Sequence, residues 1–197
     1  ALDLGIVRDD PALYLRSLEK ARALGIDVIL STGAVSMGKR DFVAEALEKF
    51  GARTLFHKVA IRPGKPILFA EASQGGKTCA VFGLPGNPVS TAVGMRFFVE
   101  PYLRALQGLP SEESIPAALG ARSSKPAGFR CFFKGRATVM DQKLQVEVLK
   151  GQASYVVSSL LEANCWVVLD EAGDFVPAGT SVGVFPLNHS FERGVLA

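Results

Sequence analysis

The stretch Thr78–Leu103, TCAVFGLPGNPVSTAVGMRFFVEPYL, predicts a strand, a tight loop and a helix in direct succession. Its first part, Cys79–Leu84, is an apolar run typical of a strand buried on both faces. Asn87 and Pro88 suit a helix cap and a first helical residue, and the helix is expected to end before Pro101. Such a junction presents backbone N–H groups that favour phosphate binding, although the same turn also occurs at α/β corners without a ligand.

The segments before this stretch alternate between strands and helices. A helix is expected after Arg8–Pro11, with Tyr14 and Leu18 on its apolar face, and a second helix is expected over residues 42–50. The polar turn Ser73–Gly76 predicts a hairpin between its flanking strands. The expected strands are Leu2–Val7, Asp27–Leu30, Thr54–Ile61, Ile67–Ala70 and Thr78–Phe82. The alternation predicts an α/β fold with a mainly parallel sheet and helices on both faces.

Polar and glycine-rich loops follow several of these strands. They are Arg8–Asp10, Thr32–Gly38, Arg62–Lys65 and Gly83–Asn87. Ligands of α/β sheets bind outside the carboxyl ends of the strands, so we expect these loops to meet at one edge and form the site.

The composition changes near residue 108. Residues 1–108 form the expected α/β domain and residues 109–116 read as a linker. Residues 117–197 contain short alternating segments, which predict a small β domain, either a sandwich or an open barrel. The first residues, 1–7, look like a strand already in progress, so a preceding segment is expected.

The composition excludes several classes of protein. A net charge of +3 is too slight to indicate nucleic-acid binding, and the apolar runs are shorter than a membrane span requires. Cys79, Cys131 and Cys165 are widely spaced, which favours reduced thiols in a cytoplasmic protein over a zinc site.

Two acidic positions follow strand ends. Asp9 or Asp10, together with Asp41, could hold Mg²⁺, which takes one or two carboxylates and completes its shell with water and phosphate oxygens. The alternative is that Asp9 caps a helix and Asp41 lies in a first helical turn, where the helix dipole favours acids.

Basic and hydroxyl side chains lie in the other loops. Lys58, Arg62 and Lys65 flank a Pro-Gly turn and could bind phosphate or another oxyanion, or could be a solvated basic loop. Ser36 and Ser90 could donate hydrogen bonds to an anion. One crevice would thus combine acidic side chains, basic side chains and the Pro-Gly-Asn-Pro start of a helix. This combination suits a phosphorylated or nucleotide-bearing ligand with a divalent cation.

Three motifs make the sequence specific: Ser31–Asp41 (STGAVSMGKRD), Ile61–Pro66 (IRPGKP) and Phe82–Ser90 (FGLPGNPVS). Together they resemble the molybdopterin molybdenumtransferase family, which includes the E domain of gephyrin. The resemblance extends to the β half, where GQAS over 151–154 and ANCWVV over 163–168 resemble the family's C-terminal barrel. It implies a molybdopterin-binding three-layer domain followed by a small all-β barrel, as the C-terminal portion of such an enzyme.

The resemblance implies a reaction and a site. Adenylylated molybdopterin binds, molybdate is transferred to its dithiolene, and the phosphoanhydride is hydrolysed with Mg²⁺, in a cytoplasmic homodimer completed by N-terminal domains. Asp9, Asp41 and Lys65 match catalytic positions, and both acids match the metal site. The substrate-binding positions are Gly33, Ser36, Gly38, Lys58, Arg62, Pro85, Gly86, Asn87, Pro88 and Ser90.

Some features leave alternatives open. The family usually has glycine, tyrosine and lysine where this sequence has Ala34, Phe42 and Arg62. One alternative is a molybdopterin adenylyltransferase, which shares the sheet domain but lacks a β domain. If the protein is a molybdenumtransferase, an adenylyltransferase is a possible partner of it. The same fold could also serve as a non-catalytic scaffold or pterin-binding module.

Overall fold

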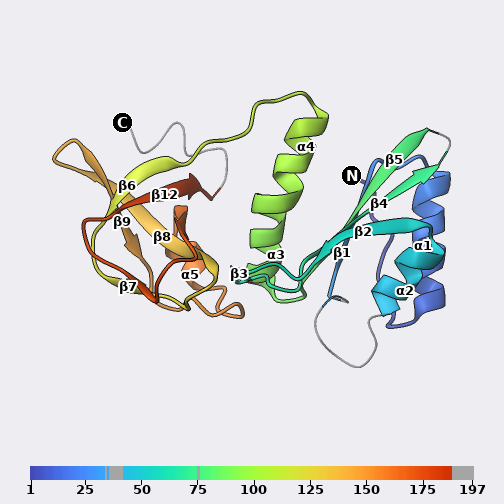
Figure 1. Ribbon diagram of the computed structural model, residues 1–197, viewed down its shortest axis with the longest axis horizontal. Helices are drawn as coiled ribbons and strands as arrows, with labels where there is room; N and C mark the ends of the chain where they lie inside the picture. Colours follow the sequence, from blue (N-terminus) through green and yellow to red (C-terminus); the bar gives the residue numbers. More distant parts are fainter. Residues whose placement is uncertain (34, 36–41, 75, 188–197) are drawn as a thin grey trace. The chain divides into compact units, whose positions relative to one another are not determined.

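The computed structural model describes residues 1–33, 35, 42–74 and 76–187. Two compact units divide the chain (Figure 1). The sheet unit comprises Ala1–Val59 and Gly64–Met95, and the barrel unit comprises Ala60–Pro63 and Arg96–Ala197. The predicted domain boundary at residue 108 stays a prediction, whereas the contacts divide the chain at Met95.

Four strands form the sheet of the sheet unit: β1 (Val28–Thr32), β2 (Ala52–His57), β4 (Leu68–Gln74) and β5 (Lys77–Leu84). Their order is β1-β5-β4-β2. β1 is parallel to β5, but β4 is antiparallel to both β5 and β2. The prediction of a mainly parallel sheet is therefore not confirmed, since both large sheets are mixed. The physical reason is the short turn after Gln74, which folds β4 and β5 into the hairpin that the sequence predicted.

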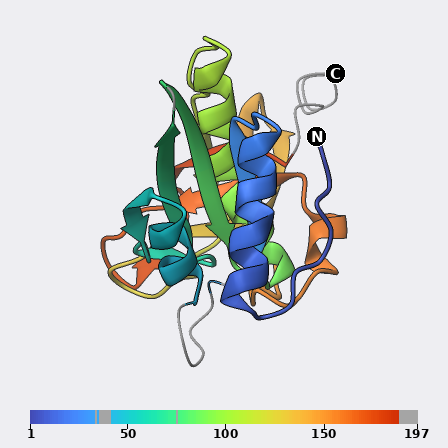
Figure 2. The same ribbon diagram turned by 90° about the vertical axis from the view of Figure 1, so that its right-hand side faces the viewer.

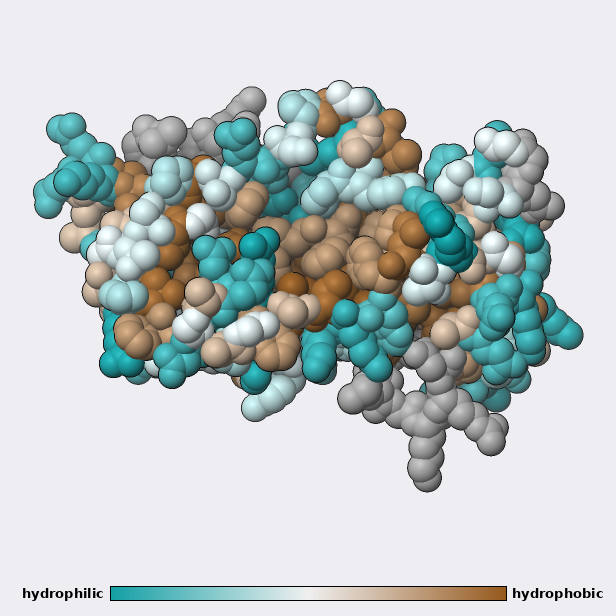
Figure 3. All heavy atoms as spheres, in the orientation of Figure 1, coloured by the Kyte–Doolittle hydropathy of each residue, from teal (hydrophilic) through white to brown (hydrophobic). Residues whose placement is uncertain are grey.

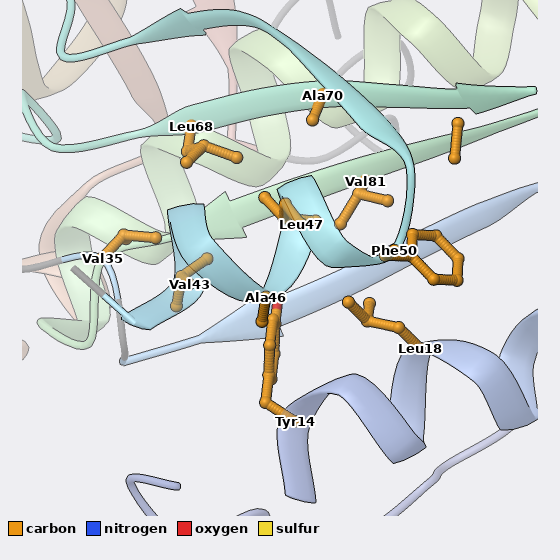
Figure 4. Packing of buried hydrophobic residues seen from close by; sticks show 11 residues of the cluster. Tyr14, Leu18, Val35, Val43, Ala46, Leu47, Phe50, Leu68, Ala70 and Val81 are labelled. Carbon is orange, nitrogen blue, oxygen red and sulfur yellow. The ribbon is translucent and has the colours of Figure 1, made fainter. Parts of the chain in front are cut away.

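Helices α1 (Pro11–Ala23) and α2 (Phe42–Lys49) pack on one face of this sheet. The predicted apolar face of α1 is confirmed, because Tyr14, Leu18 and Ala21 are buried. Figure 4 shows these two helices contributing to one core, and Figure 3 shows hydrophilic residues over the α1 side of the unit. The buried core comprises Tyr14, Leu18, Val35, Val43, Ala46, Leu47, Phe50, Leu68, Ala70, Ala72 and Val81.

Helix α3 (Pro88–Gly94) contacts the opposite face of the sheet. Successive residues of a strand point to opposite faces, so Leu84 lies on the face away from Val81 and the α1–α2 core. A Cβ atom on Gly94 would lie 2.8 Å from Cδ2 of Leu84 and 3.5 Å from Cδ1 of Ile67. The absence of a side chain at Gly94 therefore lets α3 approach the sheet, and Figure 2 shows α1 and the α3 region on different sides of the strands.

The helix after the Pro-Gly-Asn-Pro loop is longer than predicted. α3 continues into η1 (Met95–Val99), a π-helical turn, and then into α4 (Glu100–Leu106). The predicted stop before Pro101 is wrong. Proline lacks an N–H group and clashes with the carbonyl four residues earlier, and the wider π turn directly before α4 accommodates it in the first turn of α4.

The first residues do not form the predicted strand. The segment Leu2–Val7 has no strand pairing in the described structure, so this prediction is wrong. The Gly5 N–H donates to Oδ1 of Asp3 at 2.8 Å, and Gly5 has φ +83°, a left-handed conformation that ends an extended segment.

Five strands close the barrel unit: β6 (Ile115–Leu119), β8 (Arg130–Met140), β9 (Lys143–Val148), β10 (Cys165–Leu169) and β12 (Ser181–Pro186). The order β10-β12-β6-β9-β8 is closed by pairing of β10 with β8, which confirms the predicted small β-barrel. β6 begins inside the predicted linker. The remaining elements are β3 (Ile61–Arg62), which pairs in parallel with β8, β7 (Ser123–Ser124), α5 (Ser159–Glu162) and β11 (Phe175–Val176).

Arg96 joins three segments within the barrel unit. Its side chain is 8% exposed and donates to the Pro186 carbonyl of β12 at 3.2 Å. It also pairs with Glu100 at 3.3 Å and with Glu112 at 2.6 Å. A buried guanidinium requires such partners, so these contacts stabilise the packing of the helix on the barrel.

Candidate functional site

The carboxyl ends of three strands lie at one edge of the sheet unit. In the strand register, Ser31 of β1 is opposite Gly83 of β5, Gly83 is opposite Leu68 of β4, and Leu68 is opposite His57 of β2. β4 is antiparallel to its neighbours, so β1, β5 and β2 run in the same direction. The loops that follow these three strands therefore begin at the same edge, which agrees with the prediction for the loops after β1 and β5. In the described structure Arg8–Asp10 follows no strand, and Arg62 lies in β3 of the barrel unit.

Two glycines bring the loops after β1 and β5 into backbone contact. The Gly33 N–H donates to the Leu84 carbonyl at 3.0 Å, and Gly33 has φ +99°. A Cβ atom on Gly86 would lie 3.1 Å from Cα of Gly33. The structure thus brings these two predicted site residues together, and glycine is required at Gly33 for its conformation and at Gly86 for space.

A cavity of about 490 Å³ lies beside the end of β1. Its volume is in the range of ligand-binding pockets. Carboxylate, hydroxyl and aromatic groups lie among apolar residues in its wall. The lining consists of Asp3–Asp9, Tyr14, Ser17, Leu18, Ile29–Gly33 and Phe42. Asp9 and Gly33 are the predicted site residues that it contains.

The structure distinguishes the two neighbouring aspartates. Oδ1 of Asp10 accepts hydrogen bonds from the N–H groups of Ala12 at 2.7 Å and Leu13 at 3.1 Å, so Asp10 caps α1. Asp9 is exposed and lines the cavity. The alternative that Asp9 caps the helix is wrong, and its carboxylate remains available to a ligand.

The start of α3 has a well-defined loop before it. Pro88 is the first helical residue, as predicted, and Asn87 is at the N-cap position, but its side chain makes no capping hydrogen bond. The Thr91 hydroxyl instead donates to the carbonyls of Pro85 and Asn87, which fixes the loop. Gly86, Asn87 and Pro88 are exposed, whereas Pro85 and Ser90 are buried, Ser90 to 4% exposure. The Asn87 amide is therefore presented to solvent and the Ser90 hydroxyl is not.

The basic residues around the Pro-Gly turn divide between the two units. Lys58 and Lys65 are exposed residues of the sheet unit, and Arg62 belongs to the barrel unit, where it is opposite Cys131 of β8. The Lys58 N–H donates to the Ile67 carbonyl at 3.0 Å, although Lys58 has φ +66°, an unusual conformation for a bulky residue.

The predicted residues Asp41, Ser36 and Gly38 lie outside the described residues, as does Ala34. Among the residues that the structure does describe, no group of three or more histidine, cysteine or acidic side chains is placed to hold a metal ion.

One polar pair in the cavity wall was not predicted. The hydroxyl groups of Tyr14 and Ser31 are hydrogen bonded at 2.9 Å. Burial raises the pKa of the Tyr14 phenol, and the hydrogen bond to Ser31 opposes this shift. The sequence placed Tyr14 correctly on the buried face of its helix, but its hydroxyl partner 17 residues away in the chain gave no local signal.

The comparison with protein families decides where this chain belongs. Residues 1–105 match the family described as "Probable molybdopterin binding domain", and residues 116–187 match the "MoeA C-terminal region (domain IV)". The chain belongs to the molybdopterin-binding domain family. The predicted resemblance is thereby confirmed. Phe42 and Arg62, where the family usually has tyrosine and lysine, both lie within residues 1–105.

Individual relatives agree with this assignment. A molybdopterin molybdenumtransferase of Synechococcus elongatus is 43% identical over 90% of this chain and 43% of its own length. The Haemophilus influenzae protein of the same name is 33% identical over 95% of this chain and 46% of its own length. This chain of the molybdopterin-binding domain family thus spans less than half the length of these relatives.

Solved structures of related proteins have the same fold. The molybdopterin biosynthesis MoeA protein of Pyrococcus horikoshii superposes with a TM-score of 0.69 at 28% identity, covering 93% of this chain and 43% of that one. A molybdenum cofactor biosynthesis protein of Pyrococcus furiosus gives a TM-score of 0.64 at 27% identity, covering 92% and 56%. In the described part of this chain, no helix has the length and apolar character needed to cross a membrane.

Proposed function

We propose that the protein is a molybdopterin molybdenumtransferase that acts in molybdenum cofactor biosynthesis. In this reaction adenylylated molybdopterin binds, molybdate is transferred to the dithiolene, and water cleaves the phosphoanhydride so that AMP leaves. The names of the relatives and the order of the two matched regions support this proposal.

The placement of Asp9 is the observation that carries the proposal. Its carboxylate is not used for helix capping, and it lines a cavity at the end of β1. At the same edge, Gly33 and Gly86 allow close backbone approach between two loops. An acid beside exposed backbone and a nearby cavity suits a substrate with both phosphate and ring groups.

The donor set at Asp9 fits Mg²⁺, since this ion often binds one or two carboxylates and takes its other ligands from water and phosphate. We propose Asp9 and Asp41 as the residues that would hold it. When bound, the ion would neutralise charge on the phosphoanhydride.

The remaining predicted residues are proposed to bind the anionic substrate. Lys65 is the proposed catalytic residue, whose ammonium group would contact the oxygens of the phosphoanhydride or of molybdate. Lys58 and Arg62 are proposed as further cations that bind the anionic substrate. Both lysines are exposed. The proposed substrate loops contain Gly33, Ser36, Gly38, Pro85, Gly86, Asn87, Pro88 and Ser90. Within this set, the exposed Asn87 amide is the side chain best placed to donate a hydrogen bond.

The barrel unit argues against the alternative of a molybdopterin adenylyltransferase, which lacks such a domain. The match of residues 116–187 to the MoeA C-terminal region supports the molybdenumtransferase instead. We also propose a cytoplasmic homodimer whose N-terminal domains complete the site, with a molybdopterin adenylyltransferase as a possible donor of substrate. The free thiols of Cys79, Cys131 and Cys165 are in keeping with a reducing compartment.

The proposal is tested by AMP release. The complete protein is incubated with adenylylated molybdopterin, molybdate and Mg²⁺, and AMP is measured by chromatography. We expect molybdate-dependent AMP release, reduced at least about tenfold in Lys65→Ala. Lys143→Ala, at the exposed first residue of β9, is the matched control and should be fully active. No AMP release by the parent, or equal losses in both variants, would contradict the proposal.

A further inference from the structure

Two serines line the cavity that contains Asp9, and they differ in how their hydroxyl groups are hydrogen bonded. Ser31 is the residue before the end of β1, and Ser17 lies on α1; both line the cavity that contains Asp9. The Ser17 hydroxyl donates to the Leu13 carbonyl at 3.2 Å within its own helix. The Ser31 hydroxyl instead meets the phenol of Tyr14.

Tyr14 is held firmly by its surroundings. Its side chain is 7% exposed and belongs to the core between α1 and α2, where Figure 4 shows its ring extending from α1 toward Ala46. The ring of Phe42 packs against it edge to face, with the ring centroids 6.0 Å apart. The position of the phenol oxygen is thus fixed by packing that does not depend on a ligand.

The direction of this hydrogen bond follows from the chemistry of the two hydroxyl groups. A phenol is the more acidic of the two and is the better donor. In the described part of the chain, Ser31 Oγ is the one hydrogen-bond partner of the phenol. With Tyr14 donating, Ser31 Oγ accepts, and its own proton is left for another acceptor. The cavity is where such an acceptor can be reached.

We propose that Ser31 is a substrate-binding residue, which donates a hydrogen bond to the substrate in the cavity beside Asp9, and that Tyr14 is its positioning residue. This inference rests on the proposed function. The acceptor is an oxygen or ring nitrogen of adenylylated molybdopterin. Tyr14 does not touch the substrate; it holds the Ser31 hydroxyl in the orientation that the substrate needs.

The test measures binding of adenylylated molybdopterin to the complete protein by calorimetry, together with KM and kcat for AMP release. Ser31→Ala should weaken binding by about fivefold to tenfold, the usual value of one buried hydrogen bond. Tyr14→Phe should weaken it by about threefold, and should raise KM with little change in kcat, because the chemical groups at Asp9 are untouched. Ser73→Ala is the matched control, since Ser73 is exposed on β4 and does not line the cavity, and this variant should bind as tightly as the parent.

The double variant separates positioning from a structural role. If Tyr14 acts through Ser31, Tyr14→Phe has no further effect on binding once Ser31 is alanine. Additive losses in the double variant, or unchanged binding in Ser31→Ala, would overturn the inference while the parent still binds and releases AMP. If the parent fails to bind the substrate, the proposed function fails, and this inference fails with it.

Discussion

Gly86 lies so close to Gly33 that a Cβ atom on Gly86 would be 3.1 Å from the Cα atom of Gly33. This contact joins the loops after β5 and β1 at the carboxyl edge of the sheet unit. The neighbour is backbone rather than the end of a flexible side chain. A residue larger than glycine would therefore have to displace one of the two loops.

Gly86→Ala should separate these loops by a few tenths of an ångström. We expect a loss of about 1 kcal/mol in the free energy of unfolding, typical of mild overpacking, and weaker binding of adenylylated molybdopterin. Gly120→Ala is the control, because a Cβ atom there would meet its nearest neighbours at 3.5 Å, an ordinary contact. Denaturant unfolding and calorimetric binding measure the two effects, and equal behaviour of both variants would contradict the steric argument.

Lys134 should stabilise the barrel unit despite its burial. Its side chain is 0% exposed, and its ammonium group donates to the carbonyls of Gly151 at 2.7 Å and Val156 at 2.9 Å. Lys134→Met removes both hydrogen bonds and should lower the free energy of unfolding by about 1–3 kcal/mol at neutral pH. Denaturant titration measures this loss, and a variant as stable as the parent would show that burial of the charge cancels the two bonds.

The same pair of proteins should differ in pH dependence. Burial lowers the pKa of Lys134 below its ordinary value of 10.5. The unfolded chain then binds the proton more tightly than the folded chain, so the parent gains stability as the pH rises through the lowered pKa toward 10.5. Lys134→Met lacks this gain. The stability difference between parent and variant should therefore increase with pH in this range.

Cys165 should have the opposite effect at alkaline pH. Burial raises its pKa from 9.0 to about 12, although a hydrogen bond with the backbone of Ala137 opposes the shift. Above pH 9 the unfolded chain loses the thiol proton first, so the parent loses stability by up to about 1.4 kcal/mol per pH unit. Cys165→Ala should lack this slope. Parallel stability curves for parent and variant from pH 8 to 10.5 would contradict the assignment.

Local sequence signals predicted the parts of the fold that depend on nearby residues. The turn around residues 73–76 gave the β4–β5 hairpin, and helical spacing gave the buried face of α1. The helix start at Pro88 was also confirmed. Two other features were missed. Pro101 lies inside a helix because a π turn accommodates it, and Ile115 lies in a strand because β12 pairs with it.

In the candidate site, too, some features could be predicted from the sequence and others could not. Both Asp9 and Asp10 precede a proline at a helix start, so the sequence left their roles open. Only the extended backbone of Asp10, with φ −136° and ψ 116°, and its two hydrogen bonds decide which of them caps α1. The Tyr14–Ser31 hydrogen bond could not be predicted, because it joins a helix and a strand whose relative position depends on the packing of the whole sheet unit.

The central claim is that Asp9, and not Asp10, meets the substrate. Calorimetric binding of adenylylated molybdopterin with Mg²⁺ to the complete protein and to Asp9→Asn and Asp10→Asn tests it most directly. Asparagine caps a helix about as well as aspartate, so Asp10→Asn should retain both stability and affinity. Asp9→Asn should fold normally and bind at least about tenfold more weakly, a change of roughly 1.4 kcal/mol. Undiminished binding by Asp9→Asn, or an equal loss in Asp10→Asn, would contradict the account.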